Sequence, residues 1–329
     1  MTRPAALALS MLLPAAALAA GAAAQESAAP LSHITVTGEL ASPAEELVLP
    51  PDHIITVTVD GLPLRLLVTA EASGPAAVNP EIAARLGWVG TFRMLWDFGA
   101  GDPLRSDGLW RDVDFGGQLK AVPVMWSANP ASTVADGVIG IHHLPYRRVV
   151  FPLADPAGEQ HVQRFPIAQI GSDRARTLGT EIDTGDRRLQ VYFVLERPEN
   201  LVTAPTANYL ATRFDGGFEP GSEGKVTVGF GVERRTRAMR LARPLELGDM
   251  MIDRFAVRYD DHGKAKSVGE IAPNDPRFNP HEIIVSRRKK KGKADFLTRI
   301  GRDQIAHCSS LTYDLAAGEI RLACGPAPH

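Results

Sequence analysis

Two distant segments of the chain resemble each other, and this repeat constrains the fold more than any other feature. Residues 139–159 read IGIHHLPYRRVVFPLADPAGE, and residues 300–319 read IGRDQIAHCSSLTYDLAAGE. With one gap, both run from Ile-Gly through a strand pattern to a turn that ends in Ala-Gly-Glu. Self-similarity of this kind indicates that one structural unit occurs twice in the chain.

A second pair of segments repeats in the same order. HIITVTVD at 53–60 and PLRLLV at 63–68 predict two strands joined by a turn at Gly61. A polar elbow at 69–74 follows, and then a helix over 79–88 that begins with Asn-Pro and ends near a glycine. After Gly185 the same series recurs as the strand LQVYFV at 189–194, the elbow LERPEN and a short helix over 203–211. The predicted lobes, each mostly β, span 52–166 and 178–325, with a linker at 167–177.

The composition agrees with a β-rich globular protein. The chain has 25 Pro and 30 Gly, which favour many turns and short strands. With 38 acidic and 36 basic residues, the net charge of -2 argues against a general nucleic-acid binder. A charged insertion at 264–293 ends in RRKKKGK, which indicates either a solvated loop or a patch for an anionic surface or partner.

The first 24 residues have the pattern of a secretory signal peptide. Arg3 precedes an apolar run at 5–20, and small residues at 22–24 form a cleavage site. A polar, Pro-containing lead segment at 25–51 follows. We therefore expect export, to a bacterial periplasm, with no membrane span in the mature chain; an uncleaved anchor is the alternative. The pattern does not indicate an oligomeric state.

The two cysteines predict a disulfide. Cys308 and Cys324 flank a hairpin pattern and lie equally far from Ala316, as do Tyr313 and Glu319. A turn centred on Ala316 would place the cysteines opposite each other, close enough to bond. Two unrelated free thiols are the alternative.

The first lobe resembles a known family. VTVDGLPLRLLVTAEAS at 57–73, VNPEIAARLGW at 78–88 and DGVIGIHHL at 136–144 are similar to motifs of retropepsin-like aspartic proteases among bacterial secreted proteins. The family patterns are V-x-V-N-G-x-P-L-x-F-L-L-D-T-G-A-S, L-N-P-E-I-A-A-R-L-G and D-G-L-L-G-M-D-F-L. The resemblance implies a two-lobed, pepsin-like β-barrel fold, and it is weaker in the second lobe, where it rests on the internal repeat.

The departure from the family falls on the catalytic positions. The resemblance places the catalytic aspartates at Thr69 and Leu195, which carry no carboxylate. In the family's mechanism two carboxylates share one proton, and one of them deprotonates water. Threonine and leucine cannot do this near neutral pH, so the resemblance implies a degenerate site.

These observations predict a non-catalytic protein, a pseudoprotease that binds an extended peptide or an envelope protein segment between its lobes. Binding would use main-chain hydrogen bonds, as in strand addition. We expect a flap within 90–124, around 98–104. The residues expected to line the cleft are Thr69, Ala70, Glu71, Ser73, Trp96, Leu195, Glu196 and Arg197.

Two other functions remain open. An active aspartic endopeptidase could use Asp183 or a pair formed by Glu71 and Glu196. However, Asp183-Thr184-Gly185 precedes its strand instead of following it, which predicts a turn; the two glutamates could equally be exposed, or Glu196 could pair with Arg197. The third possibility is a structural envelope protein without a groove.

No motif predicts a metal or a cofactor. His-x-x-x-His, Cys-x-x-Cys and Gly-x-Ser-x-Gly patterns are absent from the sequence, and Gly229-Phe230-Gly231 lacks the third glycine of a nucleotide loop. The adjacent His142 and His143 would point to opposite faces of a strand and so could not bind one metal together.

Overall fold

A computed structural model describes residues 44–96, 98, 103–156, 158–172, 175–259 and 296–326. The predicted signal peptide, most of the lead segment and the charged insertion at 264–293 lie outside this part of the chain. The described part is mostly β, with two α-helices, which confirms the predicted class. None of its helices is long and apolar enough to cross a membrane.

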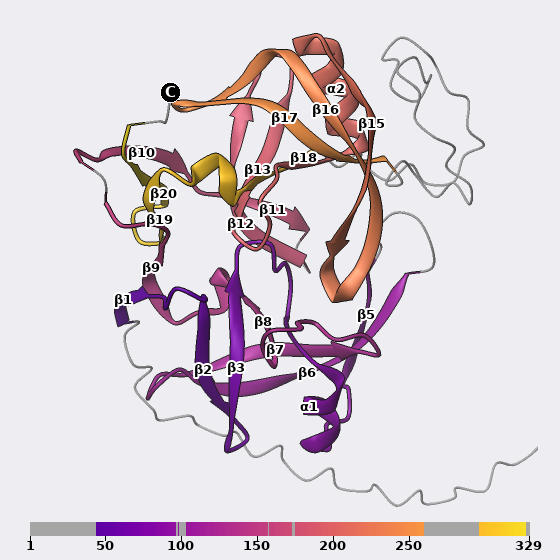
Figure 1. Ribbon diagram of the computed structural model, residues 1–329. Coiled ribbons are helices and arrows are strands. Elements are labelled where there is room, and N and C mark those ends of the chain that lie inside the picture. The colour runs from indigo at the N-terminus through magenta and orange to yellow at the C-terminus, as the bar shows by residue number, and fades with distance from the viewer. Residues whose placement is uncertain are drawn as a thin grey trace, which may run out of the picture. The chain divides into compact units, whose positions relative to one another are not determined.

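Six strands close a barrel in the first half of the chain (Figure 1). Thr58 and Val59 pair with Asp114 and Val113, which joins the first and last strands of the ring. A seventh strand, β5 (Phe92–Trp96), pairs with β6 on the other side. In order of pairing, the barrel strands are β2 (Ile54–Val59), β3 (Leu62–Thr69), β8 (Gly137–Gly140), β4 (Ala76–Val78), β7 (Leu119–Ser127) and β6 (Leu104–Asp114).

The first hairpin forms as its sequence predicts. Alternate residues of β2 and β3, such as Val57, Leu64 and Leu66, are buried in the core. Asp60 and Gly61 both have positive φ, at 49° and 77°, as a two-residue Asp-Gly hairpin turn requires. The hairpin therefore places Thr69, the last residue of β3, at the start of the elbow.

An eight-stranded sheet follows, and its central strands pair in the same order and orientation as those of the barrel. Antiparallel, parallel, antiparallel, parallel and antiparallel pairs succeed one another in both. The strands are β11 (Ala168–Ser172), β12 (Ala175–Asp183), β13 (Arg188–Val194), β18 (Leu297–Gly301), β14 (Leu201–Thr203), β17 (Met250–Arg258), β16 (Val232–Leu247) and β15 (Gly216–Val228). The stretch predicted as a linker is thus largely strand, because β11 folds back on β12.

The two helices occupy matching places. α1 (Pro80–Arg85) follows β4, and α2 (Ala204–Phe214) follows β14. Each has a proline in its first turn, and each is followed by a residue in the left-handed region, Gly87 or Asp215. Short 3-10 helices, η1 (Ile141–His143) and η5 (Arg302–Ile305), follow the Ile-Gly pairs of the sequence repeat.

The repeated segments pair with each other in a third, five-stranded sheet. Phe151 of β9 (Tyr146–Pro152) lies opposite Leu311 of β19 (Cys308–Asp314), and both are buried. The remaining strands are β1 (Ala44–Val48), β20 (Glu319–Cys324) and β10 (His161–Pro166). This sheet contains segments from both halves of the chain.

The predicted disulfide between Cys308 and Cys324 is confirmed, but the register of its hairpin differs from the prediction. Glu319 lies opposite Asp314 rather than Tyr313, because the turn between the strands has four residues. A bulge between Cys308 and Ser310 then takes up one residue and restores the cysteine pair.

Candidate functional site

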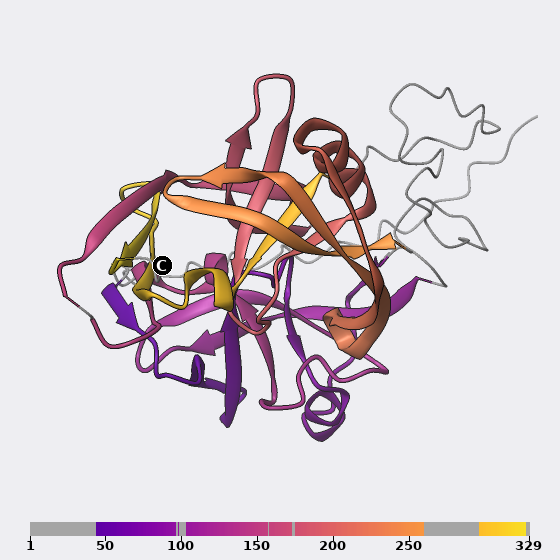
Figure 2. The ribbon, with the colours of Figure 1, turned by 45° about the horizontal axis from the view of Figure 1, so that its top comes forward.

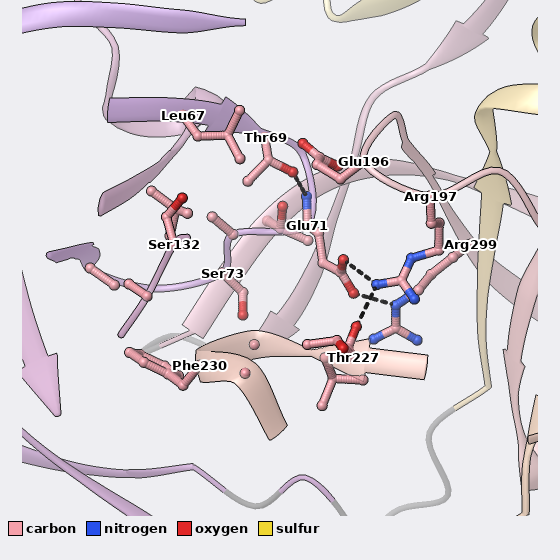
Figure 3. Close-up of a pocket in the computed structure, with 18 of the residues that line it drawn as sticks. Leu67, Thr69, Glu71, Ser73, Ser132, Glu196, Arg197, Thr227, Phe230 and Arg299 are labelled. Carbon is pink, nitrogen blue, oxygen red and sulfur yellow. Dashed lines mark hydrogen bonds and ion pairs between the residues drawn. The ribbon is translucent and has the colours of Figure 1, made fainter. Parts of the chain in front are cut away.

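A cavity of about 950 Å³ lies between the barrel and the eight-stranded sheet (Figure 3). Residues of β3, β4, β5, β7 and β8 line one side, and residues of β11, β12, β13, β15, β17 and β18 line the other. Seven of the eight residues expected to line the cleft do so: Thr69, Glu71, Ser73, Trp96, Leu195, Glu196 and Arg197. Ala70 does not line it, because its side chain is buried in the core while its carbonyl accepts a hydrogen bond from Thr177.

At each elbow the strand pairs with a glycine of the neighbouring strand. Thr69 pairs with Gly140, and Val194 pairs with Gly301. A Cβ at Gly301 would lie 2.3 Å from the Pro198 carbonyl oxygen, so only glycine lets the elbow pass this closely. On this register the counterpart of Thr69 is Val194, one residue before Leu195, and Val194 also lacks a carboxylate.

Glu71 is held by two arginines. Its Oε2 accepts a hydrogen bond from Nη2 of Arg197, and its Oε1 accepts one from Nε of Arg299, both at 2.8 Å. Burial by itself would raise the pKa of Glu71, but the charges and hydrogen bonds of Arg299 and Arg197 outweigh it and lower the pKa below its ordinary value. Glu71 is therefore ionised at neutral pH. The sequence left open a pair between Glu196 and Arg197, but the carboxylate that binds Arg197 is that of Glu71.

Glu196 has the opposite electrostatic environment. Loss of surrounding water raises the pKa of its carboxyl to about 7, although a hydrogen bond with the Thr69 side chain favours the charged form. The charge of Glu71 also raises this pKa. Glu196 remains exposed within the cavity, so water there solvates the charged form and limits the shift.

The two carboxylates do not form a proton-sharing pair. Figure 3 shows the Glu196 carboxyl beside Thr69, whereas the Glu71 side chain runs away from it towards Arg197 and Arg299. Asp183 is also separate from the cavity lining: it ends β12, and its Oδ1 accepts a hydrogen bond from the Gly185 amide at 2.8 Å. Its place in the β12–β13 turn agrees with the turn predicted from the sequence.

An aromatic contact at the tip of the β15–β16 hairpin closes one side of the cavity. Phe230 is only 6% exposed, and its ring centroid lies 5.9 Å from that of Trp96 and 6.4 Å from that of Phe98. Its carbonyl accepts a hydrogen bond from Asn129 Nδ2 at 3.2 Å. The hairpin tip lies beside the end of β5 in both views (Figure 1 and Figure 2).

Sequence reasoning missed this hairpin of the second sheet. It expected a flap only within 90–124, around 98–104, and residues 99–102 lie outside the described part. The signal for this hairpin was Gly229-Phe230-Gly231, since an apolar residue between two glycines with strand patterns on both sides is typical of a hairpin tip. Phe230 adopts a φ of 58°, which is unfavourable for a bulky residue. The buried surroundings of the ring hold the backbone in this conformation.

Of the four tryptophans, only Trp96 lines the cavity.

The prediction for the adjacent histidines was wrong about their orientation. His142 and His143 lie in η1 and not on a strand, so their rings are side by side, with centroids 4.0 Å apart. Both Nε2 atoms lie within hydrogen-bond distance of the Gly74 carbonyl oxygen. Among the described residues, the only cluster of potential metal ligands is His307 with Cys308 and Cys324, whose sulfurs are already bonded to each other.

No model of a known protein family matches this chain, and no curated protein matches it either.

Proposed function

We propose that the protein is an exported, aspartic-protease-like protein of two duplicated lobes that binds an extended peptide in its cavity without cleaving it. The matching strand order of the barrel and the eight-stranded sheet supports the duplication, as does the sequence repeat. The observation that carries the proposal is the chemistry at the equivalent elbow positions. The resemblance assigns the family's aspartates to Thr69 and Leu195, and the strand register matches Thr69 with Val194; none of these three side chains can take a proton from water.

The cavity offers an edge for strand addition. β15 is the last strand in the order of its sheet, and its residues 225–228 line the cavity. A peptide lying along this edge could exchange main-chain hydrogen bonds with β15, while Trp96 and the elbow residues contact its side chains. The volume of the cavity is within the range of sites that hold ligands.

Hydrogen exchange and proteolysis together test this proposal. The purified protein is incubated with casein peptides, and we expect slower exchange at 225–228 with no cleavage from acidic to neutral pH. Met251→Ala, an exposed change elsewhere in the sheet, should leave that protection unchanged. Protection elsewhere, or none with a folded sample, would contradict the peptide-binding role.

An aspartic endopeptidase is the second candidate function. Glu71 and Glu196 do not share a proton directly, but both line the cavity and their pKa values move in opposite directions, as in many acid–base pairs. Casein cleavage that pepstatin blocks and that Glu196→Gln abolishes would favour this candidate. Cleavage lost in Asp183→Asn instead would assign the activity to the Asp-Thr-Gly turn.

A further inference from the structure

Arg197 has hydrogen-bond donors that none of the described residues accepts. The residue is 8% exposed and lines the cavity. Its Nη2 donates to Glu71 at 2.8 Å and to the Thr227 carbonyl oxygen at 3.4 Å. Its Nε and Nη1 are buried and have no hydrogen-bond partner within the described part of the chain. A buried guanidinium with unsatisfied donors is unfavourable, because the group stays charged and cannot lose its proton.

The existing carboxylate does not satisfy this guanidinium. Glu71 divides its two oxygens between Arg197 and Arg299, so Arg197 receives a single contact rather than a two-point one. The free Nε–H and Nη1 groups lie on different edges of the planar guanidinium, so one acceptor cannot bridge them. Nη1 has two N–H donors on a charged group, and the acceptor that best complements it is an anionic one such as a carboxylate.

The position of Arg197 links this group to the proposed peptide path. Its contact with Thr227 places the guanidinium beside β15, the strand whose edge lines the cavity. Burial raises the pKa of the neighbouring Glu196, so this carboxyl takes up a proton more readily than an ordinary glutamate and then repels an incoming anion less.

We propose that the cavity selects peptides that carry a carboxylate, which binds to Arg197. The inference rests on the proposed peptide binding and names the ligand's chemical class. The carboxylate belongs either to an aspartate or glutamate side chain or to the C-terminus of the peptide, since both present the same two oxygens.

Fluorescence anisotropy with labelled, alanine-based peptides tests the inference. Three amidated peptides carry a central Glu, Gln or Lys, and a fourth carries Gln and a free C-terminus. We expect the wild-type protein to bind the Glu peptide about tenfold or more tightly than the Gln peptide, as is typical of a charge-assisted hydrogen bond. Tighter binding of the fourth peptide instead would assign the site to a C-terminal carboxylate.

Two variants locate the effect. Arg197→Gln should remove the preference for the carboxylate while leaving the weaker affinity for the Gln peptide. Arg188→Gln, which breaks a contact with Glu181 outside the cavity lining, should keep the preference. If Arg197→Gln does not fold, the affinities of the wild-type protein for the Glu, Gln and Lys peptides still show whether the cavity prefers a carboxylate.

The outcomes separate the two proposals. Equal affinity for the Glu, Gln, Lys and free C-terminal peptides would overturn carboxylate selection while supporting peptide binding. A carboxylate preference that survives in folded Arg197→Gln would overturn the role of Arg197. Absence of binding by all four peptides would overturn the proposed function and the inference with it.

Discussion

The Glu71 carboxylate lies 2.8 Å from Nε of Arg299, a residue 228 positions later in the chain. Together with Arg197, this contact ties the elbow after β3 to the eight-stranded sheet at the cavity. The side chains of Glu71, Arg197 and Arg299 are 23%, 10% and 9% exposed. Water solvates these charges poorly, so the loss of one of them destabilises the others more than it would at the surface.

Neutralising Glu71 should strongly destabilise the protein. Glu71→Gln leaves Arg197 and Arg299 without their shared carboxylate, and we expect a loss of about 3 kcal/mol in the free energy of unfolding. Urea denaturation measures this change. Glu233→Gln is the matched control, because its pair with Lys225 is exposed and should contribute less than about 1 kcal/mol. Equal effects of the two substitutions would contradict a structural role for the Glu71 cluster.

Removing the Phe230 ring should release the β15–β16 hairpin tip. Phe230→Ala loses the contacts with Trp96 and Phe98, and we expect destabilisation of about 3 kcal/mol, with faster hydrogen exchange at the tip. Phe230→Gly removes the same ring but accepts the positive φ more readily, so it should be no less stable than the alanine variant. Unchanged exchange at the tip in both variants would show that the ring does not anchor it.

The half-buried histidine pair should make the protein sensitive to acid. Burial, and next the neighbouring His142, lower the pKa of His143 from 6.5 to about 4; Lys120 acts in the same direction, and the Gly74 carbonyl opposes it. The folded state therefore binds fewer protons than the unfolded state between these values, and stability falls as pH decreases from 6.5 towards 4. The pKa of His142 is also lowered, so part of the effect remains in a single variant.

Denaturation at several pH values tests this prediction. In His143→Gln the free energy of unfolding should fall less over this interval, by about 1 to 2 kcal/mol, because glutamine does not titrate. Water at the partly exposed site moderates the pKa shift and so keeps the effect within this size. Arg188→Gln, an exposed change elsewhere, should retain the wild-type slope. Parallel curves for wild type and His143→Gln would exclude His143 as the titrating group.

The disulfide should stabilise the final hairpin. Cys308 and Cys324 are 16 residues apart, and a bond that closes a loop of this size contributes about 3 kcal/mol. The double variant Cys308→Ala/Cys324→Ala should lose this amount in urea denaturation. A reducing agent should lower the stability of the wild type towards that of the variant and leave the variant unchanged; a stable wild type after verified reduction would contradict the prediction.

Local patterns predicted much of the secondary structure. The β2–β3 hairpin follows from alternating apolar residues around an Asp-Gly turn, and α1 follows from its Asn-Pro start and Gly87 end. The cysteine pairing was also predictable, because both strands and the turn lie in one short segment. The hairpin register was not, since a bulge near Ser310 compensates for a longer turn.

The sequence by itself determined the β-rich class, the repeated segments, the lack of a carboxylate at Thr69 and Leu195, and seven of the residues that line the cavity. Only the tertiary structure decided that Glu71 binds Arg197 and Arg299, that Phe230 packs against Trp96, and that His142 and His143 share one carbonyl. Strand and turn patterns act over a few residues. Charge pairing and ring packing depend instead on how distant sheets meet, which no local pattern specifies.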